Sequence, residues 1–591
     1  MSANKSGWIR QIHKLIRFDA AKNSAKHFAS VVRLAQRTAP PIDTAQLANG
    51  PFMSFVVIIR DTPDSHLQSL LASFHAQPAG SAELILCDCA SADRQTLAWL
   101  TAHEHAQGVR IVRAGENHDI VSATNTAIGL ARGAWISLVG PNDALGPCVV
   151  QLLAQTAKQH PQCQFIYTDE VVSDEKLIPT TYLFKPAYDE VMLSGGNYIN
   201  HLACYRRDRL LALGGFRAGV DGAEDYDLLL RYVRNLRPDE ITHLPYPGYQ
   251  WRAANALGIT VTNQSSNGAR KTLAEFYHHG ESTPPIQDTI IKGRYRVRFD
   301  KLKRRWPLVS IVIPNQNSFP LISRVLADLA GRTDYPDLEI IVVDNGTTDR
   351  KVLDLYAKLR QGEVPFKCII EPGPFNFSRQ VNSGIAVATG ELILLLNNDI
   401  EVIDSDWLRE MVSCFDYSDT GIVGARLLYP SHKLQHAGTI IGLRKGLAAH
   451  WFVGRPEDYP GPMARLQIRQ SLTAVTGACM LISRACLKAV GKFDESAFPV
   501  AYNDVDFCLR AVAQGFRVVW TPFATLIHRE SASRGKDNRR PAKLSRLRRE
   551  RERLRRRHNT GNFEDRAFSP WYGRSKLEPS IVLLDQLPKA R

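Results

Sequence analysis

Two segments in the second half of the sequence end an apolar run with side chains that can bind a cation or a ligand hydroxyl. Glu339–Asp344 (EIIVVD) ends in a carboxylate, and Asn397–Asp399 (NND) follows the apolar run Gly390–Leu396 (GELILLL). A carboxylate at the end of a strand can accept hydrogen bonds from a nucleobase or ribose. One that follows an apolar strand can also hold a divalent ion against a diphosphate, because Mg²⁺ takes one or two protein oxygens and leaves the rest to phosphate and water. Taken alone, a strand-end aspartate such as Asp344 is usually a turn or helix-cap residue, and Asp399 is equally well explained as a loop residue.

Two segments further along the chain offer acid–base and metal-binding groups. Asn503–Asp506 (NDVD) begins an amphipathic segment typical of a helix, whose first turn favours acids through capping and the helix dipole. A carboxylate there also suits a general base at the edge of a pocket. His528 follows the run Arg517–Trp520 (RVVW), and a neutral imidazole at that point can complete a metal shell. A capping pair and a structural histidine are the alternatives.

The elements that must position these residues occur twice in the chain. Each half contains, in the same order, two β-branched runs, a third apolar run and an acidic pair that begins a helix. The pairs are Phe55–Arg60 with Val309–Pro314, Glu83–Asp88 with Glu339–Asp344, Gly133–Val139 with Gly390–Leu396, and Ala223–Arg231 with Tyr502–Arg510. Helical segments such as Ser65–Ser73 and Leu321–Leu329 alternate with the runs, which predicts two α/β domains, each with a mostly parallel sheet. Right-handed crossovers then bring the strand C-termini to one edge, where such sheets bind ligands.

The length and composition agree with this tandem arrangement. At 591 residues, with 44% apolar and 23% charged residues, the chain is typical of a globular protein and not of a disordered or fibrous one. We predict an N-terminal basic amphipathic segment and linker (1–50), a first α/β domain (51–280), a linker (281–306), a second α/β domain (307–532) and a basic helical C-terminal tail (533–591). The ten cysteines show no zinc-type spacing, which favours a reducing, cytoplasmic location.

Positive charge is concentrated near the end of the chain. The formal net charge is +15, and the segment between Arg534 and Arg557 holds 13 basic and 3 acidic residues. Such a segment is typical of a helix that contacts anionic lipid, of a solvated helix, or of a nucleic-acid footprint. Nucleic acid is the least favoured partner, because the tail lacks interleaved aromatic residues.

The N-terminus carries a second basic amphipathic pattern. Apolar residues recur there at helical spacing with basic residues between them: Trp8, Ile9, Ile12, Leu15 and Ile16 against Lys5, Arg10, Lys14 and Arg17. This pattern predicts a helix that lies either on an anionic membrane or on the protein's own surface. No apolar run approaches the ~20 residues of a membrane-spanning helix.

The ordered motifs of the second half resemble the inverting nucleotide-sugar glycosyltransferases of family 2, which have the GT-A fold. The resemblance runs through Ile311–Asn317 (IVIPNQN), Val342–Asp349 (VVDNGTTD), Pro374–Ile385 (PFNFSRQVNSGI), Leu394–Val402 (LLLNNDIEV), Val423–Pro430 (VGARLLYP), Gln435–Gly438 (QHAG), Val475–Arg484 (VTGACMLISR), Asn503–Arg510 (NDVDFCLR) and His528–Gly535 (HRESASRG). The tandem arrangement is similar to bacterial enzymes of O-antigen and other surface-polysaccharide synthesis, including rhamnosyltransferase-like members.

The resemblance implies a role for individual residues. Asp399 would bind the metal as the last acid of a DxD-type motif, with Asn397 in place of the first acid, and His528 would face the metal or the diphosphate. Asp504 would be the base that takes the proton of the acceptor hydroxyl. The residues implied on the nucleotide side are Pro314, Asn317, Asp344, Asn382 and Asn398, and those implied on the acceptor side are Gly477 and Ala478.

The implied reaction is a single in-line displacement at the anomeric carbon. Mg²⁺ or Mn²⁺ would offset the charge on the departing nucleoside diphosphate. The base would polarise the acceptor hydroxyl from the opposite face, which inverts the configuration.

The first repeat departs from the family pattern. Aligning Gly133 with Gly390 places Asn142 opposite Asp399, and Gln250 stands where the histidine is expected. Both departures remove metal ligands, although the candidate second-site residues Asp88, Asp143 and Asp225 are retained. Two interpretations therefore stay open. In one, the first repeat is a degenerate domain that binds acceptor glycan or supports the second domain; in the other, it is a second active transferase that uses Asp143.

We accordingly predict a metal-dependent inverting glycosyltransferase of bacterial surface-polysaccharide synthesis, with its chemistry in the C-terminal domain. Its expected partners are a nucleotide-sugar donor and a glycan or lipid-linked glycan acceptor, with peripheral contact to the inner face of the plasma membrane. One alternative is a bifunctional transferase with both domains active. An alternative of another class is a non-catalytic glycan- or polyanion-binding protein on a transferase scaffold.

Overall fold

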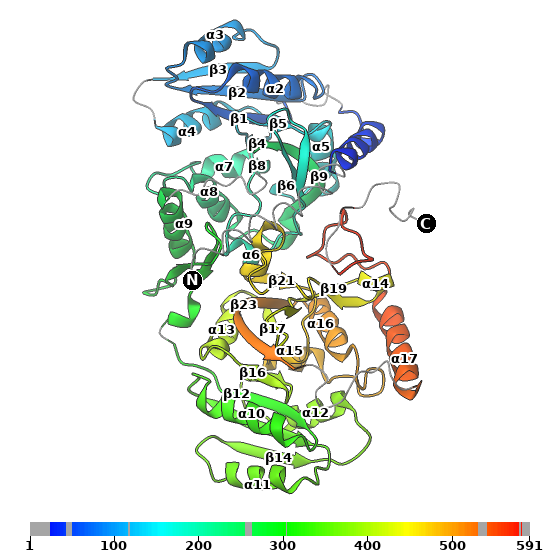
Figure 1. Ribbon diagram of the computed structural model, residues 1–591. Helices are drawn as coiled ribbons and strands as arrows, with labels where there is room; N and C mark the ends of the chain where they lie inside the picture. The colour runs from blue at the N-terminus through cyan, green and yellow to red at the C-terminus, as the bar shows by residue number, and fades with distance from the viewer. Residues whose placement is uncertain are drawn as a thin grey trace.

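A computed structural model describes residues 24–42, 50–115, 119–253, 263–302, 304–529, 541–577 and 581. Two α/β domains are stacked end to end along the long axis of the molecule (Figure 1). The predicted α/β class, the tandem arrangement and the helical C-terminal tail are confirmed. The N-terminal amphipathic pattern between Lys5 and Arg17 lies outside the described residues.

Domain one is built around a sheet whose strands lie in the order β3-β2-β1-β4-β8-β6-β9-β5, with β7 beside β6. Strands β3, β2, β1 and β4 are parallel, whereas β8 runs antiparallel to both of its neighbours. The strands are β1 Met53–Ile59, β2 Ala82–Cys89, β3 Val109–Ala114, β4 Trp135–Leu138, β5 Ala144–Leu145, β6 Phe165–Ser173, β7 Pro179–Leu183, β8 Ala203–Arg206 and β9 Ile241–Arg252. The helices are α2 Asp64–His75, α3 Arg94–Ala102, α4 Ile120–Leu130, α5 Val149–Gln159, α6 Glu190–Leu193, α7 Arg207–Ala212, α8 Glu224–Val233 and α9 Asn263–Phe276.

Domain two repeats this topology in the order β14-β13-β12-β15-β22-β17-β23-β16, with β18 beside β17 and β21 beside β23. Its strands are β12 Val309–Asn315, β13 Leu338–Asp344, β14 Phe366–Ile370, β15 Leu392–Leu396, β16 Ile400–Val402, β17 Thr420–Leu428, β18 Leu434–His436, β21 Gln470–Leu472, β22 Cys479–Ser483 and β23 Arg517–His528. The helices are α10 Phe319–Gly331, α11 Arg350–Leu359, α12 Phe377–Val387, α13 Trp407–Ser413, α14 Leu443–Gly446, α15 Arg484–Val490, α16 Asn503–Ala513 and α17 Pro541–His558, and β19 Thr439–Ile441 pairs with β20 Ala448–His450.

The same local signals form these elements in both repeats. β13 is buried along its whole length, as expected for an apolar strand covered on both faces. Asp93 caps α3 and Asp349 caps α11, each by accepting a backbone N–H of the first turn. A Cβ on Gly133 or Gly390 would come within 2.6 Å of the backbone where the first strand of its domain begins. Because such a side chain would clash there, both positions require glycine.

The two domains share a continuous core. β10 Ile286–Asp288 and β11 Tyr295–Val297 form a hairpin in the linker, which continues into a short helical turn at Phe299. The Phe299 ring packs against Tyr277 of domain one at 5.2 Å and against Tyr417 of domain two at 5.3 Å between centroids. The Tyr417 hydroxyl lies 2.7 Å from Ser194 Oγ of domain one. The linker therefore joins the domains as a packed element.

Glu410 on α13 is the charged centre of this junction. Its carboxylate accepts hydrogen bonds from Arg469 at 2.6 and 2.7 Å, from Arg296 of the linker hairpin at 2.8 Å, and from the Thr521 hydroxyl at 2.7 Å. Arg469 also donates to the carbonyl of Val297 at 2.8 Å. Glu410 and Arg469 are almost completely buried, so their charges depend on protein partners such as these for compensation.

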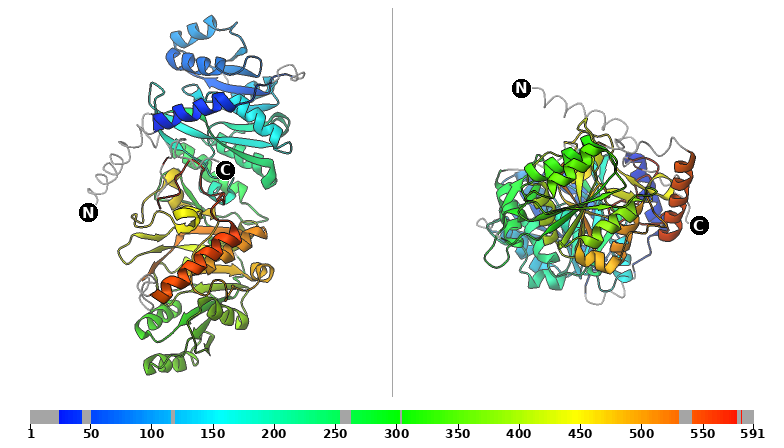
Figure 2. Two further views of the ribbon diagram at one scale, coloured as in Figure 1. Left: turned by 90° about the vertical axis from the view of Figure 1, so that its right-hand side faces the viewer. Right: turned by 90° about the horizontal axis from the view of Figure 1, so that it is seen from below.

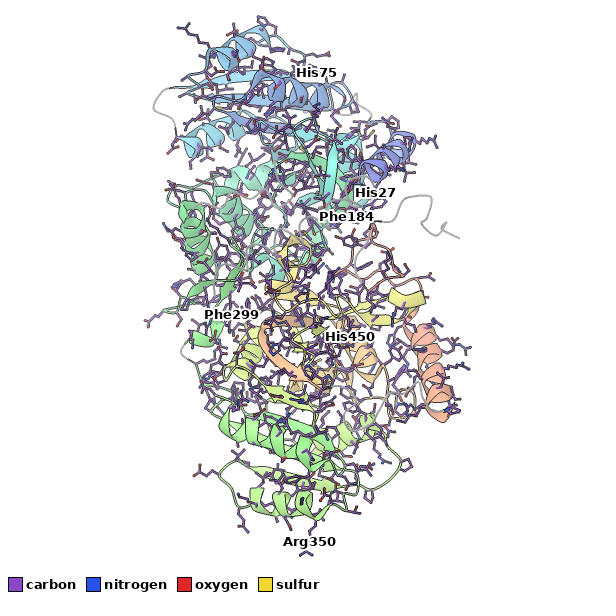
Figure 3. The ribbon with its side chains drawn as sticks, in the orientation of Figure 1. His27, His75, Phe184, Phe299, Arg350 and His450 are labelled. Carbon is purple, nitrogen blue, oxygen red and sulfur yellow. The ribbon has the colours of Figure 1, made fainter. Side chains whose placement is uncertain are left out.

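The C-terminal segment after α17 crosses both domains. The Asp565 carboxylate accepts the backbone N–H of Ile441 at 2.8 Å in domain two. Trp571 then donates from Nε1 to the carbonyl of Pro245 at 2.8 Å in domain one. His27, in the helical stretch 24–38, packs edge-on against Trp571 and against Phe184; Figure 3 labels His27 and Phe184 side by side.

The basic tail forms helix α17, which lies along the flank of domain two (Figure 2). Leu554 is fully buried, and Glu550 accepts the backbone N–H of Val500 at 3.1 Å. Arg557 forms ion pairs with Asp494 and Asp506 at 2.8 and 3.1 Å. One side of the tail is thus docked on the protein itself. Across the described residues we find no helix with the length and apolar character needed to cross a membrane.

Replacing Glu410 with glutamine should lower the free energy of unfolding by about 3–5 kcal/mol at neutral pH, because the buried Arg469 loses its counter-charge. Burial raises the pKa of Glu410, but Arg469 and Arg296 outweigh it and lower that pKa to about 2. The contribution should therefore be complete above pH 4.5 and disappear as the pH falls towards 2.

Urea unfolding across this pH range measures both effects. The half-exposed pair Glu552–Arg556 on α17 provides the control, since Glu552→Gln should change stability by less than about 1 kcal/mol. Equal effects of the two substitutions would contradict the role given to Glu410.

Candidate functional site

Asp344 lies at the carboxyl end of β13 and holds the following turn. Its Oδ1 accepts the backbone N–H of Thr347 at 2.6 Å, and its Oδ2 accepts the hydroxyls of Thr347 at 2.6 Å and Tyr356 at 2.8 Å. Asn315, at the end of β12, donates to the Tyr356 hydroxyl at 2.8 Å and to Asp344 Oδ2 at 3.4 Å. Asp344 is therefore a buried acid at the sheet edge, held in place by hydrogen bonds from the following turn and from Tyr356.

The other residues assigned to the nucleotide side lie on the same edge. Asn317 has a positive φ of 51°, and its Oδ1 accepts the backbone N–H groups of Thr348 and Asp349. Asn398 donates to Asn315 Oδ1 at 2.7 Å, which links the loop after β15 to the Asp344 cluster. Pro314 is half-buried in β12 beside Asn315.

Asn382 lies apart from this cluster, within α12. Its side chain donates to the Phe493 carbonyl and to Glu495, and accepts the Phe493 backbone N–H, with distances of 2.7–3.0 Å. These bonds attach α12 to the segment that leads to α16. Its described contacts are thus structural ones within the domain.

Asp399 and His528 form the candidate metal site. Paired strands bring them together, since Ile400 of β16 is opposite His528 of β23. His528 Nδ1 lies 2.6 Å from Gln435 Oε1, and its Nε2 lies 3.1 Å from Asp399 Oδ1 and 3.3 Å from Asn397 Nδ2. In the tautomer that donates from Nδ1 to Gln435, the Nε2 lone pair faces this side of the site. Asp399 Oδ1 is buried, and no hydrogen bond within the described chain reaches it.

This arrangement fits a divalent cation. An orphaned carboxylate oxygen facing an imidazole lone pair is the donor set that a metal would satisfy. Gln435 holds the imidazole from behind, as outer ligands commonly do. Among the described residues, no group of three or more His, Cys, Asp or Glu side chains forms a complete metal site. Asp399 and His528 therefore supply only part of a shell, which leaves positions for diphosphate and water.

Asp504 stands at the first turn of α16 on the same side. It accepts the backbone N–H of Gly477 at 2.9 Å and that of Val505 at 2.8 Å, and it is half-exposed. The carbonyl of the next residue, Ala478, accepts the backbone N–H of Asn397 at 2.9 Å. The Gly477–Ala478 segment thus ties the candidate base directly to the metal-binding loop.

Asp506, the other acid of the motif, has a structural role. It is buried and bonds to Arg510, Arg557 and His558 at 2.8–3.1 Å. Burial raises the pKa of Asp506, and these cationic and hydrogen-bonding partners more than compensate, which lowers it below its ordinary value. Of the two acids, only Asp504 remains available to a ligand.

Sequence reasoning missed three residues of this site: Asn315, Tyr356 and Gln435. Asn315 and Gln435 lie inside motifs quoted for the resemblance, at a strand end and beside a histidine. Tyr356 gives no such signal, because it is one apolar-face position of α11 until the helix packs against β13. Its hydroxyl reaches Asp344 only in the folded domain.

The strand register corrects the alignment of the first repeat. Met53 pairs with Trp135 as Val309 pairs with Leu392, but Ala144 pairs with Gln250 as Ile400 pairs with His528. Domain one therefore has one extra residue in the loop between β4 and β5. The residue before the paired strand, and hence opposite Asp399, is Asp143 and not Asn142.

Asp143 is nevertheless held differently from Asp399. Its Oδ2 accepts the Tyr249 hydroxyl at 2.6 Å, and its Oδ1 accepts the Arg252 backbone N–H at 2.8 Å. Burial raises the pKa of Asp143 above its ordinary value. Both carboxylate oxygens of Asp143 are thus already hydrogen-bonded to the protein, and Gln250 lies where domain two has a histidine. This arrangement does not fit a metal site.

The two other candidate second-site acids keep their places. Asp88 is the penultimate residue of β2 and accepts the Ser91 backbone N–H at 3.2 Å, as Asp344 does with Thr347. Asp225 lies in the first turn of α8 and accepts Asn197 Nδ2 at 3.1 Å. Asp227 forms an i,i+4 ion pair with Arg231, as Asp506 does with Arg510.

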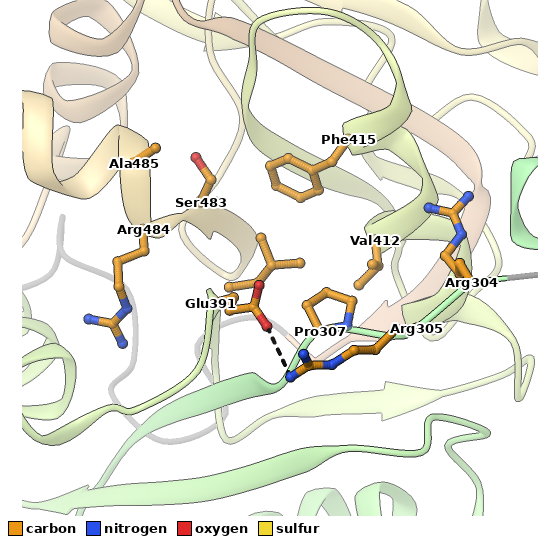
Figure 4. Close-up of a pocket in the computed structure, with 10 residues that line it drawn as sticks. Arg304, Arg305, Pro307, Glu391, Val412, Phe415, Ser483, Arg484 and Ala485 are labelled. Atoms are coloured by element: carbon orange, nitrogen blue, oxygen red, sulfur yellow. Dashed lines mark ion pairs between the residues drawn. The ribbon is translucent and has the colours of Figure 1, made fainter. Parts of the chain in front are cut away.

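A separate pocket of about 420 Å³ lies at the opposite edge of the domain-two sheet (Figure 4). Leu392 at the start of β15 and Ser483 at the end of the antiparallel β22 line it. Arg305 there reaches Glu391 at 4.0 Å. The pocket lies away from Asp399 and Asp504, so it is not part of the candidate active site.

Comparison with known proteins identifies the family. The sequence profile of "Glycosyl transferase family 2" matches residues 54–212 and 310–491, one segment in each domain and together more than half of the chain. The chain therefore belongs to glycosyl transferase family 2, as the sequence motifs predicted.

Two curated relatives match most of the chain. An uncharacterized protein, y4gI, of Sinorhizobium fredii is 36% identical over 89% of this chain and 58% of its own length. The O-antigen biosynthesis protein RfbC of Myxococcus xanthus is 33% identical over 85% of this chain and 39% of its own length. The chain thus spans about half the length of these relatives.

Among solved structures, the mannosyltransferase PcManGT of Pyrobaculum calidifontis, in complex with GDP-Man and Mn²⁺, is 17% identical. The alignment covers 42% of this chain and 63% of that one, with a TM-score of 0.31.

The different surroundings of Asp504 and Asp506 predict different effects on stability. Asp506→Asn should lower the free energy of unfolding by about 1.5–3 kcal/mol, because it removes charge-assisted hydrogen bonds from a buried group. Asp504→Asn, the matched control two residues away, should change it by less than about 1 kcal/mol, since the amide oxygen still accepts a backbone N–H. Urea unfolding measures both, and a larger loss for Asp504→Asn would contradict the assignment.

Proposed function

We propose that this protein is a metal-dependent inverting glycosyltransferase whose chemistry takes place in domain two. The observation that carries the proposal is the link through Gly477 and Ala478, which joins Asp504 to the loop that carries Asp399. A base and a metal ligand held on one short segment can act on the two faces of one sugar. The proposal extends the family membership to a particular domain and mechanism.

Each side chain has one task in this reaction. The Asp344 cluster with Asn315 and Asn398 holds the nucleoside end of the donor at the sheet edge. Asp399 and His528 would hold Mg²⁺ or Mn²⁺, which when bound offsets the negative charge on the leaving nucleoside diphosphate. Asp504 accepts the proton of the acceptor hydroxyl as that oxygen attacks the anomeric carbon from the opposite side.

The substrates are proposed by chemistry and by relationship. The donor is a nucleotide sugar of hexosyl or rhamnosyl type, and the acceptor is a glycan or lipid-linked glycan. The printed function of the Myxococcus xanthus relative, O-antigen biosynthesis, favours a role in bacterial surface-polysaccharide synthesis. We place this reaction at the inner face of the plasma membrane, where lipid-linked acceptors are presented.

We propose that domain one is a degenerate transferase domain that does not transfer sugar. Asp143 stands in the place of Asp399, which favours the bifunctional alternative, but both of its oxygens are hydrogen-bonded to the protein. The non-catalytic alternative is weaker for domain two, where Asp399 Oδ1 is left without a hydrogen bond from the described chain.

Turnover tests the assignment of the two domains. Asp504→Asn should reduce the release of nucleoside diphosphate by about 10²–10⁴-fold, because a positioned base contributes that factor. Asp225→Asn, at the corresponding helix position of domain one, is the matched control and should retain most of the activity. A wild-type rate in Asp504→Asn would place the chemistry elsewhere.

The exposed side of α17 favours contact with an anionic membrane. Arg548, Arg549 and Arg556 share one arc with Glu552, opposite the docked Glu550 and Leu554. The docked side already has its partners, so the remaining positive charge faces outward.

Charge reversal at Arg548, Arg549 and Arg556 to glutamate should weaken binding to phosphatidylglycerol-containing vesicles by about tenfold or more, since each arginine near such a surface contributes about 1 kcal/mol. Vesicle co-sedimentation measures it. Arg350→Glu with Lys351→Glu on α11, at the far end of domain two (Figure 3), is the control. Equal binding of wild type and the α17 variant would contradict the membrane contact.

A further inference from the structure

The loop that holds the nucleoside end of domain two is reproduced in domain one, contact by contact. Asp61 has a φ of 47°, and its Oδ1 accepts the backbone N–H groups of Ala92 and Asp93 at 2.7 and 2.8 Å. Asn317, with a φ of 51°, makes the same pair of bonds in domain two. A left-handed residue that is not glycine is costly, so its recurrence marks a loop conformation held in both repeats.

The contacts around this loop correspond as well. Ser91 Oγ accepts the Asp61 backbone N–H at 3.0 Å, as Thr347 Oγ1 accepts that of Asn317 at 2.7 Å. Arg60 donates to the Cys89 carbonyl at 2.9 Å, where domain two has Gln316 donating to the Asn345 carbonyl at 3.0 Å. Domain one therefore keeps this loop conformation but has the cationic Arg60 at the position of Gln316.

A cavity of about 360 Å³ lies beside this loop. Its lining includes Ile58, Arg60, Asp61, Ile120, Pro141 and Asn142, from the ends of β1 and β4 and the start of α4. Apolar walls with a few polar and charged side chains are typical of a pocket for a flat small molecule such as a nucleoside. Asn142, which lines the cavity, is the chain neighbour of Asp143.

Beyond Asp143, a second cation stands where domain two has a small residue. Ile136 pairs with Tyr205 as Ile393 pairs with Ile482, so His201 on the approach to β8 corresponds to Ala478. The His201 ring stacks on Tyr249 at 4.7 Å between centroids, and Tyr249 is the residue that bonds Asp143. An imidazole from a neighbouring strand therefore lies beside the acid that replaces Asp399.

The buried Glu170 holds this imidazole and is itself paired with the buried Lys185. Glu170 accepts from His201 Nδ1 at 2.8 Å and pairs with Lys185 Nζ at 2.6 Å, and both Glu170 and Lys185 have no exposed side-chain surface. Although burial opposes the charged ring, Glu170 raises the pKa of His201 above its ordinary value. The His201 side chain keeps 24% of its surface exposed and so remains able to meet a ligand.

From these observations we infer that domain one binds a nucleoside diphosphate without a divalent cation, with the nucleoside in the cavity at Arg60 and the charge of His201 in place of a metal. The inference rests on the proposed function, because it assigns donor-type recognition to a second domain. It goes beyond that function in giving the chain two nucleotide sites with opposite metal requirements.

Calorimetric titration of full-length Asp399→Asn protein with UDP, GDP and dTDP in EDTA tests the inference. One site should remain for at least one of these nucleotides. Arg60→Gln and His201→Ala, which introduce the domain-two residues, should each weaken it by about tenfold or more, because each removes a charge-assisted contact. Lys158→Gln, an exposed charge on α5 of the same domain, is the control, and circular dichroism verifies folding.

The outcomes are decisive in both directions. Binding in EDTA that falls in the Arg60 and His201 variants supports the inference. Absence of binding in EDTA, binding restored only by Mn²⁺, or binding indifferent to both variants overturns it. Failure of the proposed function would be visible separately. In that case the Mn²⁺-dependent binding of the wild-type protein would be retained in Asp399→Asn, and its turnover would be retained in Asp504→Asn.

Discussion

The molecule depends on one buried carboxylate, Glu410, which lies between the two domains. Two arginines and a threonine bond to it, one arginine coming from the linker hairpin and the other from domain two. A charge taken out of water is stable only if its partners stay in place. The hairpin, the adjacent Tyr417 and the contact with Ser194 are thereby fixed, so the two sheets are held in one relative orientation.

Within that frame, the two domains share one topology but differ in side chains at the sheet edge. The strand order and the nucleoside loop are the same in both, because they depend on backbone pairing and on a few capping side chains. The difference lies in three side chains at the sheet edge: Arg60 for Gln316, His201 for Ala478 and Gln250 for His528. The two repeats thus differ at strand ends, while the sheet provides the common support.

Helix α17 illustrates how a charged segment can serve two purposes. Its buried side supplies Glu550 and Arg557 to the segment that leads to α16, and Arg557 reaches Asp506 in the turn after Asp504. Its outer side keeps arginines with solvent around them. The amino-acid composition of the tail does not show which side of the helix docks on the protein and which side faces outward, because the same residues would also suit a fully solvated helix.

The sequence alone determined the tandem α/β organisation, the family and the order of the acidic motifs, because periodicity and local motifs are short-range properties of the chain. The family resemblance singled out Asp504 over Asp506 without a structural reason, and the sequence alignment placed Asn142 instead of Asp143 opposite Asp399. The first distinction needs α17 to bring Arg557 and His558 to Asp506, and the second needs the pairing of β5 with β9. Tyr356, Gln435 and His201 likewise reach their partners only through contacts between segments far apart in sequence. Such contacts depend on strand register and on the packing of separate elements, which only the tertiary structure decides.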